Sequence, residues 1–271
     1  MSQRQPAMLD SSDRGLAYGD GLFETMRVAA DGSIPLLAWH LLRLGRGAQA
    51  LGIPVPSTAR LELAVEKARA SLAGEGLIKL MVTRGVGGRG YLPPADPTPS
   101  LLWQTGKLPV WNDRDRREGI VMGLCSRPLQ VDPFAGHKHL NRLAQVQARA
   151  EVARQGWQEG LLLSARRQPL EATAMNLFAR FEDGWWTPDL VAANTGVAGV
   201  MRDWLLDHLN TRAEPVQCDL RPLSQLRHAQ AVFLTNSVVG VLPVRKLAQW
   251  QWSVPTSVRN LQSRVDALFG A

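Results

Sequence analysis

The stretch Gly21-Leu-Phe-Glu-Thr-Met-Arg-Val28 alternates in character from one residue to the next. Leu22, Met26 and Val28 fall on one side, and the odd-numbered residues fall on the other. A period of two is typical of a strand with one face in a core. The sequence therefore predicts a strand over 21–28.

A helix is expected soon after this strand. From Leu37 to Leu51, apolar residues recur at steps of three and four, which predicts one buried stripe on a helix and places His40, Arg43 and Gly47 off that stripe. The elements expected next are a helix over 61–72 and a strand over 77–84. This part of the chain is therefore expected to be α+β.

The polar stretch 108–118 carries a proline and is the candidate linker between a small domain, 1–107, and a larger α/β domain, 119–271. The elements expected in the larger domain are a strand over 120–124, a helix over 140–154, a hairpin turning at Glu182-Asp-Gly184, a helix from near Gly199, a strand over 231–235 and a helix over 257–269.

Composition bounds the class of protein. The 271 residues are 45% hydrophobic and 20% charged, which is typical of a globular chain and not of a disordered or fibrous one. No apolar run approaches the ~18 residues that cross a bilayer, and the first residues offer no stretch for a secretion signal, so we expect a soluble, cytoplasmic protein. Cys125 and Cys218 stand alone, which leaves no CxxC metal site or disulfide framework.

The net charge of +7 raises nucleic acid as a partner, but the basic residues are spread along the whole chain. A solvated surface of mixed sign is the better interpretation, and we expect no nucleic-acid or membrane partner. Only five of the 31 cations are lysines, namely Lys67, Lys79, Lys107, Lys138 and Lys246. A lysine among other polar residues therefore stands out in this chain.

The common catalytic motifs GxxxxGK[ST], HExxH and GxSxG are absent, and no metal-type Cys/His cluster is present, so no metal is expected. Gly85-Val-Gly-Gly-Arg-Gly90 follows a strand, but its spacing is not GxGxxG and the prolines after it cannot open a helix. We interpret it as a mobile binding loop; a plain surface turn is the alternative.

Lys138 lies between two histidines in Gly136-His-Lys-His-Leu-Asn-Arg142, just before a predicted helix. A helix start and neighbouring imidazoles disfavour a further positive charge, and the neutral amine is the form that acts as nucleophile or base. The alternative is an exposed lysine near a helix start.

Three further segments contain groups that suit an anionic or charged ligand. Glu171 lies between two predicted strands, where an ordinary turn carboxylate is the alternative. The turn Asn194–Arg202 runs into a helix whose free N–H groups suit a phosphate, although a tight turn without a ligand is common. The hydroxyl and amide groups of Thr235-Asn-Ser237 end a strand, where they can bind an anion or cap a turn.

Together these segments resemble the fold-type IV pyridoxal-phosphate enzymes, the superfamily of the branched-chain and D-amino-acid aminotransferases, and within it the aminodeoxychorismate lyases. The matching segments are 13–24 (DRGLAYGDGLFE), 40–44 (HLLRL), 83–91 (TRGVGGRGY), 137–143 (HKHLNRL), 171–178 (EATAMNLF), 199–202 (GVMR) and 233–237 (FLTNS) with Pro243 and Val244. KHLNRL and RGxGGRGY are the segments that look like the lyases. The resemblance implies a two-domain fold-type IV architecture with the cofactor site between the domains.

The resemblance also implies roles for individual residues around pyridoxal 5'-phosphate. Lys138 would form a Schiff base with the cofactor, and Glu171 would pair with its pyridine nitrogen, which keeps the ring an electron sink. The phosphate would be held by Arg43, by the backbone of Val200 and Met201, by Ser237 and by the neighbouring Asn236.

The reaction implied is the conversion of aminodeoxychorismate to 4-aminobenzoate and pyruvate, a step of folate biosynthesis. Lys138 would act as the base, and Thr25 is the candidate acid. Because the substrate is a dicarboxylate, we expect Arg84 and Arg89 to bind it, with Tyr18 lining the pocket. A homodimer is expected from the resemblance alone.

Two alternatives remain open at this point. One is a D-amino-acid or branched-chain aminotransferase on the same fold, which only the HLNRL and GGRGY contexts oppose. The other is a basic, non-catalytic binding protein, which would carry no chromophore and would bind with a steep salt dependence.

Overall fold

The computed structural model describes residues 9–270, so the expectation drawn from the first eight residues lies outside the described part. The chain forms two compact units. Among the described residues, unit 1 comprises 9–109, His137–Asn141 and Gly270, and unit 2 comprises Val110–Gly136 and Arg142–Phe269. The first boundary lies within the expected linker, but most of that linker belongs to unit 2, where residues 113–118 form a helix capped by Asn112.

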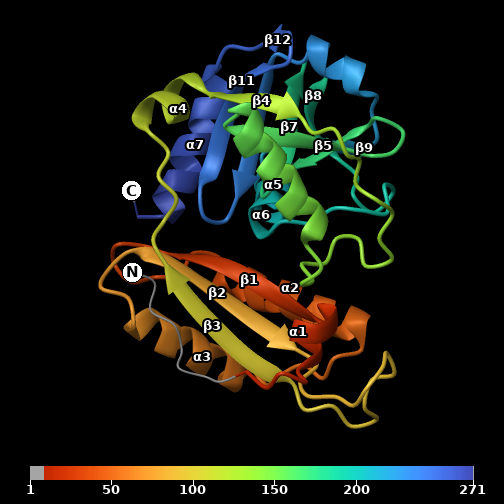
Figure 1. Ribbon diagram of the computed structural model, residues 1–271. Coiled ribbons are helices and arrows are strands. Elements are labelled where there is room, and N and C mark those ends of the chain that lie inside the picture. The colour runs from red at the N-terminus through yellow and green to blue at the C-terminus, as the bar shows by residue number, and fades with distance from the viewer. Residues whose placement is uncertain (1–8, 271) are drawn as a thin grey trace. The chain divides into compact units, whose positions relative to one another are not determined.

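Unit 1 is a three-stranded antiparallel sheet in the order β1-β2-β3, with helices packed against one of its faces (Figure 1). Its elements are α1 (Arg14–Tyr18), β1 (Gly21–Val28), α2 (Leu37–Leu51), α3 (Thr58–Ala70), β2 (Gly76–Thr83) and β3 (Ser100–Gly106). The expected strand over 21–28 and the elements predicted near 37–51, 61–72 and 77–84 are confirmed. Only β3 and the short α1 were not expected.

The inner face of this sheet forms the core of unit 1. Leu22, Met26, Ile78 and Leu80 are at most 1% exposed, and each fully buried side chain of this size contributes about 1.5–3 kcal/mol. The prediction that His40 and Gly47 lie off the buried stripe of α2 is wrong, since both are buried. The helix turns these two residues toward the sheet because a buried carboxylate, Glu24, requires a polar partner there, and because only a glycine fits beside Leu22.

The segment around Lys138 extends the sheet of unit 1 on the other side of β1. The amide of Phe23 donates to the carbonyl of Lys138 at 3.0 Å, and the amide of Leu140 donates to the carbonyl of Gly21 at 2.9 Å. Gly19, at φ 68°, makes room for this segment, because an added Cβ would lie 2.3 Å from Oδ1 of Asn141. Two motifs far apart in the sequence therefore meet here.

Unit 2 contains a sheet that closes on itself, because β10 pairs with both β11 and β7. The order is β10-β11-β4-β5-β6-β7-β8-β9, and β12 pairs with β11. The strands are β4 (Ile120–Leu124), β5 (Glu159–Leu163), β6 (Pro169–Ala172), β7 (Asn176–Phe181), β8 (Gly184–Pro188), β9 (Val216–Asp219), β10 (Ala231–Asn236), β11 (Gly240–Leu247) and β12 (Trp250–Gln251). The hairpin turning at residues 182–184 is confirmed.

Helices accompany this closed sheet, and α5, α6 and α7 contact β5, β10 and β11 respectively (Figure 1). They are α4 (Asp113–Glu118), α5 (Leu143–Gln155), α6 (Val200–Asn210), the 3-10 helix η1 (Leu223–His228) and α7 (Thr256–Leu268). The three longer helices confirm those expected near 140–154, 199 and 257–269. The core inside the sheet includes Leu177, Leu234 and Leu242, none of them exposed.

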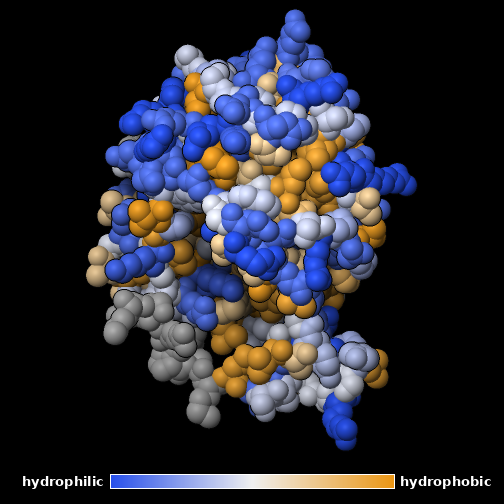
Figure 2. Space-filling model, turned by 45° about the horizontal axis from the view of Figure 1, so that its top comes forward, coloured by the Kyte–Doolittle hydropathy of each residue, from blue (hydrophilic) through white to orange (hydrophobic). Residues whose placement is uncertain are grey.

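The surface carries both hydrophilic and hydrophobic residues. Figure 2 shows hydrophilic residues over most of the visible face, with hydrophobic patches between them. Within residues 9–270 no helix combines the length and the apolar character needed to span a bilayer. The same residues contain no cluster of three or more His, Cys, Asp or Glu arranged to hold a metal ion.

Candidate active site

Glu24 on β1 carries a buried carboxylate in unit 1. Its side chain points to the face of the sheet opposite Phe23. Glu24 is 1% exposed, and its Oε1 and Oε2 accept hydrogen bonds from Arg43 at 2.8 and 2.5 Å. Nδ1 of His40 contacts Oε2 at 2.6 Å and is the donor, since an ionised carboxylate only accepts. The predicted phosphate ligand Arg43 is therefore tied to Glu24; its contact with a cofactor phosphate remains a prediction.

Burial and the contacts among Glu24, His40 and Arg43 determine the protonation states of these three residues. Burial opposes ionisation of Glu24, but the charge of Arg43 and the hydrogen bonds from His40 and Arg43 outweigh it and lower its pKa to about 2. Burial lowers the pKa of His40, although the bond to Glu24 opposes this effect. At neutral pH the cluster thus holds an anion, a cation and a neutral imidazole.

Lys138 lies on the edge of β1, and its Nζ is 4.4 Å from the centre of the Phe23 ring. Phe23 and Thr25 are on the same face of β1, so the candidate acid Thr25 shares a face with the ring that Lys138 contacts. The expected placement of Lys138 at a helix start is not what the structure shows, because α5 begins only at Leu143. Backbone pairing with β1 holds Lys138, in place of a helix dipole.

Arg84 occupies a buried polar network near the start of β1. Its guanidinium donates to Oδ2 and Oδ1 of Asp20 at 2.7 and 3.1 Å and to the carbonyls of Leu51 and Gly52 at 2.8 and 2.7 Å. Burial opposes ionisation of Asp20, but bonds and charges from Arg84 and Arg14 lower its pKa. These bonds fix the Arg84 guanidinium within unit 1, and its contact with a substrate stays a prediction.

The glycine-rich loop is anchored by Arg14. Its terminal nitrogens donate to the carbonyls of Gly90, Tyr91 and Leu92 at 3.2, 2.8 and 3.4 Å. Tyr18 packs on the loop as well, with its ring 5.4 Å from that of Tyr91. The structure therefore places Tyr18 beside this loop, and it leaves Arg89 exposed at the loop surface.

Glu171 is the central acidic residue of unit 2. It lies within β6 and is 4% exposed, so the alternative of an ordinary turn carboxylate is excluded. Its Oε2 accepts from the amide of Val197 at 2.9 Å, and its Oε1 accepts from the amide group of Gln145 at 3.4 Å. Val197 also pairs with Gly136, which precedes Lys138 by two residues in the chain.

The start of α6 lies beside the same segment. Gly199 caps the helix without a side-chain bond to the first N–H groups, and Val200 and Met201 form its first turn. An added Cβ at Gly199 would lie 2.1 Å from Oδ1 of Asn176, so a larger residue here would displace the Asn176 side chain. Backbone N–H groups without a side-chain cap suit an anion such as a phosphate.

Asn236 ends β10, and Ser237 is the first residue of the turn that leads to β11. Oδ1 of Asn236 accepts from the amides of Val238 and Val239 at 3.0 and 2.8 Å, and its side-chain amide donates to the carbonyl of Ala174. Asn236 thus builds the turn that presents Ser237. In the described part of the chain, the buried hydroxyl of Thr235 has no hydrogen-bond partner.

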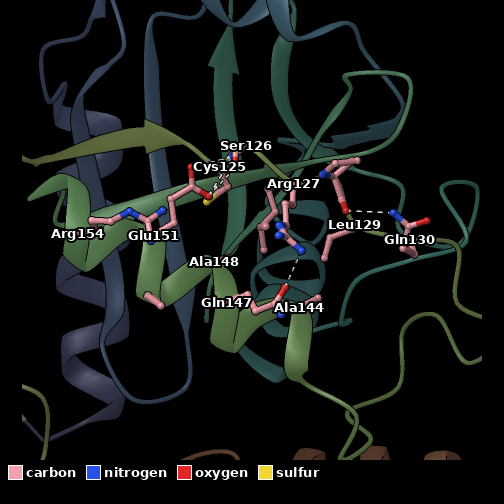
Figure 3. A pocket seen from close by; sticks show the side chains of 13 residues that line it. Cys125, Ser126, Arg127, Leu129, Gln130, Ala144, Gln147, Ala148, Glu151 and Arg154 are labelled. Atoms are coloured by element: carbon pink, nitrogen blue, oxygen red, sulfur yellow. Dashed lines mark hydrogen bonds between the residues drawn. The ribbon is translucent and has the colours of Figure 1, made fainter.

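A further cavity of about 650 Å³ lies in unit 2, between α5 and the segment after β4. Figure 3 shows the side chains that line it. Arg127 donates to Gln147 there, and Ser126 donates to Glu151. Cys125 lies in the wall, where burial and the nearby carboxylates raise its pKa to about 12. Its thiol is therefore protonated at neutral pH and is no nucleophile.

Sequence reasoning missed Glu24 and His40. A signal was present, because Glu24 falls on the same side of the strand as Leu22 and Met26, and a carboxylate in a buried row requires partners. Asp20, which binds Arg84 and Arg14, was quoted within a motif but received no role.

Known proteins match this chain over most of its length. The family model for amino-transferase class IV matches residues 21–247. The aminodeoxychorismate lyase of Vibrio harveyi is 32% identical over 94% of this chain and 93% of its own.

Two solved structures share the architecture. The crystal structure of 4-amino-4-deoxychorismate lyase from Pseudomonas aeruginosa has a TM-score of 0.89 and 39% identity, covering 98% of each chain. A hypothetical aminotransferase from Mycobacterium tuberculosis, in a PLP-bound form, has a TM-score of 0.82 and 24% identity, covering 98% of this chain and 95% of its own. The predicted fold-type IV architecture is thereby confirmed.

Proposed function

Because the chain belongs to the amino-transferase class IV family, we propose that it is a pyridoxal-phosphate-dependent lyase that converts 4-amino-4-deoxychorismate to 4-aminobenzoate and pyruvate. The observation that carries the proposal is a pair of fixed groups. Lys138 is held on β1 in unit 1, and Glu171 is buried and bonded to Val197 in unit 2. These are the amine and the carboxylate that such chemistry requires.

The described residues fit a cofactor of this kind. Lys138 would hold its aldehyde, Glu171 would face its pyridine nitrogen, and the phosphate would meet the first turn of α6 with the Ser237 hydroxyl and Arg43. The fit is supported by the N–H groups of α6 that no side chain caps, and by the buried Thr235 hydroxyl that has no partner in the described residues. When bound, the cofactor supplies an electron-withdrawing ring.

The residues of the chain then have distinct tasks. The Lys138 amine removes the proton from the amine-bearing carbon of the substrate, and the bond from the neighbouring carbon to the enolpyruvyl oxygen breaks. The departing enolpyruvate takes up a proton, for which Thr25 is the candidate donor, and becomes pyruvate. The ring that remains is aromatic 4-aminobenzoate, so the elimination is strongly downhill. Glu171 would stabilise positive charge at the pyridine nitrogen of the bound cofactor.

An assay without any keto-acid acceptor tests this function. Purified holoenzyme should release pyruvate and 4-aminobenzoate from aminodeoxychorismate, and Lys138→Ala should abolish the release. Borohydride should remove the visible absorbance of the protein and fix the label on Lys138. A requirement for a keto-acid acceptor would instead establish an aminotransferase, and label on another residue would refute the role of Lys138.

The same proposal includes a homodimer and a place in folate biosynthesis in the cytoplasm. The relatives are named as aminodeoxychorismate lyases, which supports the proposed place in folate biosynthesis. Sedimentation of the purified chain measures the assembly, and a mass of one chain at assay concentration would contradict the dimer.

A further inference from the structure

Arg14, the first residue of α1, is a buried cation with most of its donors directed at a loop. Its side chain is 5% exposed, and Nε donates to Oδ2 of Asp20 at 2.9 Å. Its two terminal nitrogens donate to the carbonyls of Gly90, Tyr91 and Leu92. One guanidinium therefore binds both the carboxylate before β1 and three consecutive carbonyls of the glycine-rich loop.

The loop depends on Arg14 for its conformation. Residues 84–99 connect β2 to β3 without a helix or strand of their own. Within residues 9–270, the bonds from Arg14 are the only hydrogen bonds that residues 88–92 form. Tyr91 is 83% exposed, so burial adds little to the order of this stretch. A segment with so few contacts opens readily when they are removed.

Helix α1 is a fixed support for Arg14. Asp13 caps the helix by accepting from the amide of Gly15 at 2.8 Å. The other carboxylate oxygen of Asp13 accepts from the hydroxyls of Thr83 and Ser100 at 2.9 and 2.7 Å. The start of α1 is therefore bonded to both β2 and β3.

The other end of α1 contacts the segment that carries Lys138. The carbonyl of Gly19, the C-cap of α1, accepts from the side-chain amide of Asn141 at 3.3 Å. Asn141 follows Lys138 by three residues. Because α1 has five residues, it is about 7.5 Å long. This helix therefore spans the short distance between the glycine-rich loop and the segment of the reactive amine.

We infer that Arg14 is a positioning residue for the substrate, which it acts on by fixing residues 88–92. The inference rests on the proposed function, in which a dicarboxylate substrate must reach Lys138. The fixed stretch includes Arg89, the predicted ligand of a substrate carboxylate, at an exposed position. Without the bonds from Arg14, the substrate would have to order this stretch when it binds, and that cost lowers affinity.

A purely structural role would need only the charge of Arg14 beside Asp20. Lysine supplies such a charge, but its ammonium group lacks the planar fork that reaches Asp20 and three carbonyls together. Arg14→Lys therefore separates the two roles, since it keeps a cation for Asp20 and loses the bonds to the loop. Arg14→Met removes both.

The first experiment measures steady-state kinetics of the holoenzyme with aminodeoxychorismate. Arg14→Met should raise KM about 10- to 100-fold, because bonds from a charged group are lost. The change in kcat should be smaller, because the pairing of Lys138 with β1 does not involve Arg14. Arg14→Lys should show most of the increase in KM. Arg60→Met, which removes an exposed arginine of α3 in the same unit, should match the wild type.

Limited digestion of the same holoenzymes with trypsin measures the order of the loop without turnover. Trypsin cleaves after Arg89, and cleavage follows the population of the open loop. Arg14→Met and Arg14→Lys should raise the initial rate at this bond about 10-fold, as measured by mass spectrometry. Arg60→Met should leave the rate unchanged.

Two glycines of the loop give a matched pair of variants that keep Arg14. An added Cβ at Gly87 would lie 2.7 Å from Cδ of Arg14, whereas one at Gly88 would meet nothing within 4 Å. Gly87→Ala should therefore displace the arginine stem and raise both KM and the cleavage rate. Gly88→Ala should leave the cleavage rate at the wild-type value.

The inference requires KM and the cleavage rate to rise together. A wild-type value of either quantity in Arg14→Met overturns it. If Arg14→Met loses its fold, wild-type KM and cleavage in Gly87→Ala, with its fold confirmed by circular dichroism, overturn it equally. A wild type that releases no pyruvate refutes the proposed lyase instead, while the cleavage rates still report on the loop, so the two failures are distinguishable.

Discussion

Each unit buries a carboxylate, and the two units compensate it differently. In unit 1, Glu24 accepts from the guanidinium of Arg43 and from His40. In unit 2, Glu171 accepts from a backbone amide, that of Val197, and from the neutral side chain of Gln145. Both carboxylates are at most 4% exposed, so burial alone does not separate them.

The difference suggests that Glu24 and Glu171 have different roles. A carboxylate paired with a guanidinium of its own unit contributes mainly to the stability of the fold. Breaking such a pair leaves an uncompensated charge in the core. Glu171 accepts from the Val197 amide and the Gln145 side chain, and in the proposed function its charge would stabilise a protonated pyridine nitrogen. We therefore expect substitution of Glu24 to affect stability most, and substitution of Glu171 to affect turnover most.

The largest effect is expected for Glu24→Gln. The substitution leaves the largely buried guanidinium of Arg43 without its carboxylate, so the free energy of unfolding should fall by about 3–5 kcal/mol. Urea denaturation at pH 7 measures it. Glu62→Gln, at an exposed position of α3, should stay within about 0.5 kcal/mol of the wild type. A loss below 1 kcal/mol for Glu24→Gln would show that the cluster does not hold unit 1 together.

The acid stability of the wild type tests the same cluster. The pKa of Glu24 is lowered from 4.5 to about 2 in the folded state, so its contribution is complete above pH 4.5 and is lost as the pH falls toward 2. This contribution is about 3 kcal/mol. The lowered pKa of His40 acts in the same direction below pH 6.5, because protonation then favours the unfolded chain. Unfolding at a series of pH values should show the loss, and Glu24→Gln should lack the part between 4.5 and 2.

The features that could be predicted from the sequence are those that depend on local patterns. The strand over 21–28 and the helix from Leu37 are fixed by local periodicity, so their bounds agree with the structure. Lys138 and Glu171 were singled out by their residue types and motif contexts, and their roles toward a cofactor stay predictions. The reason given for Lys138 changed, since pairing with β1 and not a helix start holds it.

Hydrogen-bond partners that are far apart in the sequence could not be predicted from local patterns. Arg84 is bonded to Asp20 and to carbonyls of α2 and its cap, which lie 32 to 64 residues away in sequence, so no local pattern assigns its donors. The strands β6 and β11 were missed because one has four residues and the other contains Pro243, which argues locally against a strand. Lys79 was counted as a scarce lysine, but only the sheet register places it beside Phe23 and Thr25.

Glu171→Gln tests whether the buried carboxylate of unit 2 affects turnover more than stability. The amide oxygen can still accept from Val197, so the free energy of unfolding should fall by only about 1 kcal/mol. Turnover should fall about 100-fold, because the charge that stabilises the pyridine nitrogen is lost. Glu182→Gln, in the exposed turn between β7 and β8, is the matched control and should keep wild-type turnover. If Glu171→Gln instead unfolded as readily as Glu24→Gln while its folded fraction kept full turnover, Glu171 would be a structural carboxylate, and the contrast between the two units would disappear.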